Sequence, residues 1–245
     1  MGLGLGLGSG PAQGSPRGVA AGLAVVGALA LTSALGCAAP NLSRTVGAGN
    51  YELRGNVGGA VIGNLGTPMP LPMVYVGGRY GVRDWVDVDG NFGLTAAAFG
   101  IWAMDLGGNF QLYRKPGGLA VASSARLYLL GDLDHAPKAR AYPELGLHLG
   151  GPVLPWLHLY GGSTLFAQFK PPQGKPPVFL TPFFGVEFLL PERQGRRRAR
   201  QHGIAVHASW TNPWQDATSV VDYRPGYGAL SVQLGYRARF GGLDR

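Results

Sequence analysis

The stretch 229–240, ALSVQLGYRARF, alternates apolar side chains with small or polar ones. A period of two places the two sets on opposite faces of a β-strand. The same alternation recurs in about ten runs between residues 51 and 240, most of them near the 9–11 residues that a tilted membrane-spanning strand needs. This recurrence predicts an all-β domain in which every strand has one apolar and one polar face.

The runs predict an antiparallel up-and-down β-barrel of about ten strands, and the last run, 229–240, would close against the first. An even number of strands also leaves both ends of the barrel domain on one side, the periplasmic side in bacterial barrels. Barrels of eight or twelve strands are the alternatives. The expected strands are 51–62, 73–82, 85–96, 101–114, 119–130, 142–150, 156–169, 178–190, 203–211 and 229–240.

Charged residues make up only 14% of the chain, against roughly 25% in ordinary globular proteins. With the repeated strand pattern, this low charge suits an outer wall that faces lipid. The pattern resembles that of small bacterial outer-membrane β-barrel proteins over Tyr51 to Phe240. The resemblance implies a location in the outer membrane, contact with outer-membrane lipids and insertion by the barrel assembly machinery. A soluble periplasmic β-sandwich or lipocalin-like binding barrel is the alternative.

Residues 1–36 have the features of a signal peptide, because Arg17 precedes the apolar run Val19–Leu35, which is short for a spanning helix. The following Ala34-Leu35-Gly36-Cys37 resembles the lipobox of bacterial lipoproteins, although Ala34 and Leu35 are swapped relative to its usual order. The resemblance implies lipidation of Cys37 and cleavage just before it. The alternative is a non-lipidated signal peptide cut near residues 38–40.

This interpretation divides the chain into four parts. Residues 1–36 form the signal peptide, 37–50 a tether, 51–240 the outer-membrane β-barrel and 241–245 a C-terminal tail. The tether is expected because 38–50 contains Pro, Ser, Gly and Asn without any strand pattern. Cys37 is the only cysteine, so an internal disulfide is excluded.

The inward faces of the expected strands carry charges of both signs. A small barrel has room inside mainly for side chains, and unpaired buried charge is costly. We therefore expect a network of paired charges that fills the lumen, with a narrow polar pore or a ligand pocket as the alternative. The members of this network are Arg54, Arg79, Asp87, Asp89, Asp105, Arg126, Glu144, Glu187, Arg237 and Arg239.

The loop 191–202 is strongly basic, with five arginines against Glu192, a charge of +4. We expect it to contact anionic lipid headgroups, where each arginine contributes on the order of 1 kcal/mol. A solvated turn is the alternative. Nucleic-acid binding is not expected, because the loop lacks aromatic residues and a recognition helix. The arginines are Arg193, Arg196, Arg197, Arg198 and Arg200.

His207 and Ser209 are the weak candidates for catalysis. At a spacing of two they point the same way, so the imidazole could activate the hydroxyl. The stretch loosely resembles the His-x-Ser stretch of outer-membrane lipid A deacylases, which implies an esterase with a Ser-His-Glu triad. No Glu follows Ser209, and both residues belong to the expected inward face, whereas a lipid-cleaving site must face the bilayer.

No metal or cofactor is expected, because the inward His148 and His158 lack a third ligand. The sequence therefore predicts a non-enzymatic outer-membrane lipoprotein barrel with a structural, interaction or narrow-channel role. A lipid A deacylase-like esterase and a soluble lipocalin-like barrel are the alternatives. The sequence leaves the solute, the ligand and the oligomeric state open.

Overall fold

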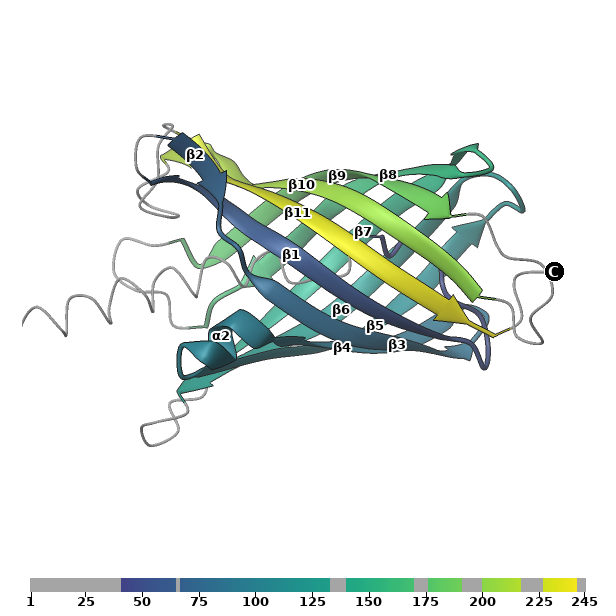
Figure 1. The fold of residues 1–245 in the computed structure, drawn as a ribbon, viewed down its shortest axis with the longest axis horizontal. Helices are drawn as coiled ribbons and strands as arrows, with labels where there is room; N and C mark the ends of the chain where they lie inside the picture. Colours follow the sequence, from purple (N-terminus) through teal and green to yellow (C-terminus); the bar gives the residue numbers. More distant parts are fainter. Residues whose placement is uncertain are drawn as a thin grey trace, which may run out of the picture.

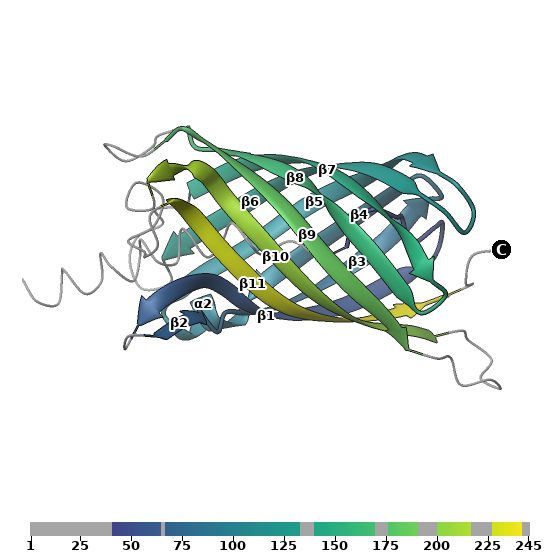
Figure 2. The same ribbon diagram turned by 90° about the horizontal axis from the view of Figure 1, so that it is seen from above.

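A computed structural model describes residues 41–64, 67–132, 140–169, 176–190, 200–216 and 227–241. Within these ranges, ten long antiparallel strands follow one another in sequence order, and the last pairs with the first to close a barrel (Figures 1 and 2). The prediction of an antiparallel barrel of about ten strands is confirmed.

The long strands match the expected runs closely. Their bounds are β1 (Tyr51–Asn64), β3 (Val74–Arg83), β4 (Val86–Gly93), β5 (Ile101–Arg114), β6 (Ala120–Asp132), β7 (Arg140–Leu154), β8 (Leu157–Ala167), β9 (Val178–Leu190), β10 (Arg200–Asp216) and β11 (Tyr227–Phe240).

The barrel closes where β1 meets β11. Tyr51 is the register partner of Phe240, Ala60 is the partner of Ser231, and the rings of Tyr51 and Phe240 stack with centroids 4.9 Å apart. The expected closure of 229–240 against the first strand is therefore confirmed. The barrel end at which β1 begins and β11 ends, at the right in Figure 1, is called the terminal end, and the opposite one the far end.

Two short elements at the far end depart from the predicted pattern. Strand β2 (Thr67–Pro70) folds back on the end of β1. The helix α2 (Leu94–Ala98) replaces the last part of the run 85–96, because its Thr-Ala-Ala-Ala stretch favours a helical turn that Gly100, with φ +76°, ends. Among the described residues, no helix is long and apolar enough to cross a membrane.

The alternation of faces follows the sequence except near irregularities. A strict period of two along the expected strands 51–62 and 101–114 places Val61 on the outer face and Tyr113 on the inner face, but Val61 is buried and Tyr113 is exposed. Gly58 has φ +130° and lies where a Cβ atom would be 2.3 Å from the carbonyl oxygen of Val232, and beyond it β1 leaves β3 and pairs at Val61 with the short strand β2. The change at Tyr113 follows a register shift that begins at Gln111.

The far end of the lumen is filled by aromatic and aliphatic side chains. Phe166 lies at its centre, with ring centroids 5.2 Å from Tyr142, 5.6 Å from Tyr128 and 6.1 Å from Phe179. The side chain of Ala96, from α2, is buried against the same cluster. This cluster gives the barrel an apolar core at the far end, whereas the buried charged side chains lie in the middle of the lumen and toward the terminal end.

Candidate functional site

Residues 41–50, here called the inner segment, lie inside the barrel near its terminal end. Leu42, Ser43, Thr45 and Val46 are each no more than 2% exposed. The sequence analysis expected a tether at 37–50, but the described part of that stretch packs against the inner wall. Its lack of a strand pattern has a physical reason, because the backbone groups of its buried part bond to barrel side chains, and only its last residues, Gly49 and Asn50, bond to the backbone of β3.

The inner segment is held mainly through its main chain. The N–H of Val46 donates to the Asp87 carboxylate, 3.0 Å from Oδ2, and the N–H of Thr45 donates to Oε1 of Gln111 at 3.0 Å. Gln111 in turn donates from Nε2 to the carbonyl oxygen of Ser43 at 3.0 Å. These contacts attach the segment to the neighbouring strands β4 and β5.

Arginine side chains hold the same segment from other strands. Arg79 of β3 donates to the carbonyl oxygen of Arg44, and Arg239 of β11 donates to that of Val46. Arg44 itself reaches outward to the carbonyl oxygen of Gly118, in the turn between β5 and β6. The segment is therefore attached to β3, β4, β5 and β11 and to the turn after β5.

A second layer of polar side chains crosses the middle of the lumen. Asp89 accepts from Arg54 and from Arg126, the latter at 2.7 Å, and Arg126 also pairs with Asp105. Asn91 completes the network by donating to Asp105 at 2.8 Å. Because these charged side chains are at most 2% exposed, each of them depends on its partners for compensation.

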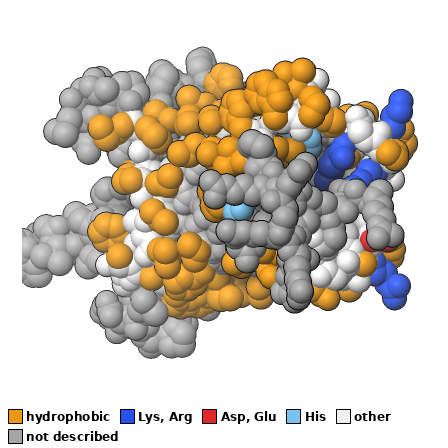
Figure 3. Space-filling view, turned by 45° about the vertical axis from the view of Figure 1, so that its right-hand side comes forward, with side chains coloured by type: hydrophobic (Ala, Val, Ile, Leu, Met, Phe, Trp, Pro, Cys, Tyr) orange, Lys and Arg blue, Asp and Glu red, His pale blue; other side chains and the backbone are white. Residues whose placement is uncertain are grey.

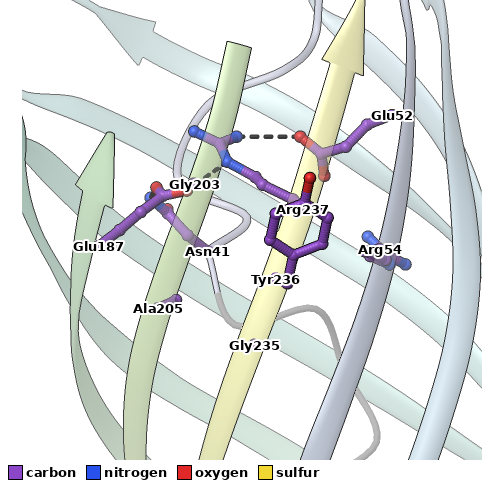
Figure 4. A pocket seen from close by; sticks show the side chains of 9 residues that line it. All are labelled: Asn41, Glu52, Arg54, Glu187, Gly203, Ala205, Gly235, Tyr236 and Arg237. Carbon is purple, nitrogen blue, oxygen red and sulfur yellow. Dashed lines mark hydrogen bonds and ion pairs between the residues drawn. The ribbon is translucent and has the colours of Figure 1, made fainter. Parts of the chain in front are cut away.

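A third cluster lies beside the inner segment, where Arg237 sits between two carboxylates (Figure 4). Arg237 pairs with Glu52 of β1 at 2.9 Å and with Glu187 of β9. Asn41, in the inner segment, donates to the same Glu187 at 2.7 Å. Arg237 on β11 therefore links the adjacent β1 to β9, which lies beyond β10, and through Glu187 it links both to the inner segment.

The structure places all ten predicted network residues on the lumen side. Nine are buried, and Arg237 is partly buried. Glu144 belongs to the periphery of the network, with the hydroxyl of Tyr128 donating to it at 3.4 Å. The sequence analysis missed Glu52 as a member, although its spacing of two from Arg54 places it on the same strand face. It also missed the inner segment, for which the sequence carries no comparable signal.

His207 and Ser209 also face the lumen. The imidazole of His207 lies between the rings of Tyr160 and Phe183, with centroids at 5.9 Å and 5.3 Å, and Ser209 is buried beside Ser231 in the register of β10 and β11. The pair is therefore surrounded by lumen side chains rather than by the outer surface. This location agrees with the inward face expected from the sequence. A lipid substrate in the bilayer would not contact His207 or Ser209 there.

A different histidine and serine are joined by a hydrogen bond. His148 Nε2 lies 2.9 Å from Ser124 Oγ, and both residues are buried, so this contact ties β6 to β7 inside the barrel. Within the described parts of the chain, no group of three His, Cys, Asp or Glu residues is arranged to hold a metal ion.

Two predicted sites lie outside the described residues. Cys37 belongs to residues 1–40, and four arginines of the basic loop 191–202 belong to 191–199, whereas residues 200–202 start β10, with Arg200 described only in its backbone. Their predicted roles stay predictions. The strands that flank the loop, β9 and β10, meet at the terminal end, which fixes the end of the barrel to which it is attached.

A closed ten-strand antiparallel barrel with charges inside and apolar side chains outside has the architecture of a transmembrane β-barrel. No protein-family model matches the chain, and no curated protein matches it either.

Several solved structures match the chain with little sequence identity. The porin NanC is 9% identical over 76% of this chain and 98% of its own, with a TM-score of 0.41. The translocator domain of the autotransporter NalP from Neisseria meningitidis is 12% identical over 93% and 98%, with a TM-score of 0.35. A Pseudomonas aeruginosa FadL homologue is 9% identical over 78% and 64%, with a TM-score of 0.32. The assignment of the fold rests on the strand pairing rather than on these likenesses.

Proposed function

We propose that the protein is a bacterial outer-membrane β-barrel. The observation that carries this proposal is the distribution of polarity. Large apolar side chains such as Leu106, Leu145 and Phe184 are more than half exposed on the barrel wall, while charged side chains lie in the lumen or at strand ends. A soluble domain has the reverse arrangement, and an apolar surface this extensive needs a cover, which a bilayer supplies (Figure 3).

Exposed aromatic side chains at the two ends of the barrel support the same proposal. Tyrosine and tryptophan favour the boundary between lipid and water, and membrane barrels carry a belt of them at each boundary. The terminal end faces the periplasm in this proposal, because both ends of the barrel domain lie there. The exposed aromatics are Tyr51, Tyr80, Trp85, Tyr113 and Trp156 at the terminal end, and Phe99, Phe169, Trp210 and Trp214 at the far end.

We propose that the barrel is closed in this state and has a non-enzymatic structural or interaction role. The inner segment occupies the terminal end, the Arg126 network crosses the middle, and the aromatic cluster fills the far end. A cavity between Tyr75 and Tyr128 measures only about 10 Å³, close to the space of one water molecule, and the larger space at the terminal end is bounded by the inner segment. A closed lumen favours a membrane-embedded scaffold over an open pore.

Planar-bilayer recording with the purified chain tests this proposal. The native protein is expected to show no stable single-channel current. A variant without residues 41–49 is expected to show stepwise increases in current as single channels insert. Steady conductance of the native protein, altered by Asp89→Ala or Arg126→Ala, would support the second candidate, a narrow channel for small solutes. That candidate is favoured by the polar side chains that line the terminal end of the lumen.

The location in the membrane is tested separately. The mature protein is expected in the outer-membrane fraction and to require detergent for extraction. If it stays in solution without detergent, the membrane assignment fails and a soluble binding barrel takes its place. The esterase alternative predicts a changed lipid A acyl pattern that Ser209→Ala abolishes, and the lumen position of Ser209 does not support it.

We also propose that Cys37 carries a lipid anchor and that the basic loop contacts anionic headgroups. The lipobox-like sequence supports the first, and the attachment of the loop at the terminal end supports the second, because that end meets the membrane surface in this orientation. The intact mass of the mature protein tests the anchor, since Cys37→Ser removes the diacylglycerol mass only if the thiol is modified.

A further inference from the structure

A cavity of about 230 Å³ lies at the terminal end, between the inner segment and the barrel wall. Arg44 and Thr45 of the inner segment line it on one side, and His158 of β8, Gln201 of β10 and Arg239 of β11 line it on the other. A single water molecule needs roughly 10–15 Å³ of such space, so the cavity has room for a small hydrated solute.

The charge of this cavity is one-sided. Three arginines line it, Arg44, Arg237 and Arg239, and no Asp or Glu is among its described lining residues. Guanidinium groups stay protonated, so the three side chains keep their charge at any relevant pH, although that of Arg237 is compensated by its two carboxylates. Arg237 pairs with the carboxylates of Glu52 and Glu187. These two carboxylates line a smaller neighbouring pocket instead (Figure 4).

The arginines are held in place by their other contacts. Arg239 donates to the carbonyl oxygen of Val46, Arg44 donates to that of Gly118, and Arg237 is fixed by its two carboxylates. Such anchoring reduces the side-chain entropy that would be lost when a ligand binds. Neutral donors from Gln201 and Thr45 add hydrogen-bonding groups to the same lining.

We propose that this cavity binds a small oxyanion of the phosphate class. Planar guanidinium groups match the oxygen geometry of phosphate and can donate two parallel hydrogen bonds to it. A bound phosphate group would contact the inner segment through Arg44 and the barrel wall through Arg239, so it would also hold the segment in the lumen. The inference does not depend on the proposed membrane location, because it concerns the interior alone.

Thermal unfolding of the full chain in zwitterionic detergent tests the site. At constant ionic strength set with chloride, inorganic phosphate is expected to raise the Tm in a saturable way, by about 2–4 °C at millimolar concentration. Arg44→Gln is expected to abolish most of the rise. Gln201→Glu removes no charged contact but places a carboxylate in the cavity, and it is expected to abolish the rise as well.

The controls separate this site from unspecific effects and from lipids. Arg83→Gln removes an exposed arginine of the same barrel end and is expected to keep the full rise. A rise caused only by a short-chain anionic phospholipid would identify a lipid headgroup as the source of the phosphate group. The proposal is overturned if neither probe shifts the Tm saturably, or if Arg44→Gln and Gln201→Glu respond to phosphate like the native chain.

Discussion

The main-chain N–H of Val46 donates a hydrogen bond to the carboxylate of Asp87, 3.0 Å from Oδ2, with both residues fully buried. The same carboxylate pairs with Arg79 on the neighbouring strand. Hydrogen bonds to ionised groups are about twice as strong as neutral ones, and here one charged group serves both the wall and the inner segment. Asp87 therefore joins the closure of the terminal end to the stability of the barrel.

Replacing Asp87 by Asn is expected to loosen the inner segment and to destabilise the barrel. The amide removes the charge that compensates Arg79, and loss of one partner from a buried pair costs about 3–5 kcal/mol. Urea unfolding from lipid vesicles, followed by tryptophan fluorescence, measures the change. Asp84→Asn is the matched control, because the exposed Asp84 accepts from Ala48 of the same segment. An equal loss in both variants would contradict the role assigned to Asp87.

Arg126→Met is expected to lower the free energy of unfolding by a similar amount, because it leaves the charges of Asp89 and Asp105 less compensated in the middle of the lumen. The estimate is again about 3–5 kcal/mol of unfolding free energy. Arg140→Met removes an exposed arginine at the start of β7 and is expected to change the stability by about 0.5 kcal/mol or less. Indistinguishable unfolding curves for the two variants would mean that the central network contributes little.

The strand positions and the charged face of the lumen follow from the sequence because both depend on a period of two. Asp87 and Asp89, or Arg237 and Arg239, are placed on one face by spacing alone, without knowledge of any partner. Which charges meet depends on the register and on the curvature of the closed barrel. For that reason the sequence predicted the members of the network but not pairs such as Arg126 with Asp89 and Asp105.

The predictions from the sequence were wrong or incomplete where the backbone leaves the regular hydrogen-bonding pattern of the sheet. Val61 is buried where β1 leaves β3 for the short strand β2, and the register shift after Gln111 turns Tyr113 outward. The inner segment could not be predicted, because its hydrogen bonds go to side chains that lie far away in the sequence, such as Asp87 and Gln111. Local patterns carry no information on such contacts.

Gly58→Ala is expected to destabilise the closure of β1 against β11. The added Cβ would lie 2.3 Å from the carbonyl oxygen of Val232, on a backbone with φ +130° that other residues rarely adopt. Strain of this kind costs about 1–3 kcal/mol. Gly55→Ala is the control on the same strand, since the added Cβ would lie 3.7 Å from its nearest neighbour, the carbonyl oxygen of Tyr75. The fraction that keeps compact mobility on an unheated detergent gel should fall for Gly58→Ala alone, and equal behaviour would argue against a strained closure.

Cysteine labelling tests the position of the inner segment directly. In a Cys37→Ser background, a cysteine replacing Leu42, which is 1% exposed, is expected to react slowly with a charged maleimide, whereas one replacing the exposed Ala48 reacts fast. Adding Asp87→Asn should raise the rate at position 42 by about tenfold or more, because a loss of 1.4 kcal/mol in segment binding already corresponds to tenfold more open state. The rate at position 48 should stay nearly constant, since that side chain is exposed in either state. Fast labelling at position 42 in the otherwise native barrel would show that the segment does not occupy the lumen, and the closed state would then lack its main support.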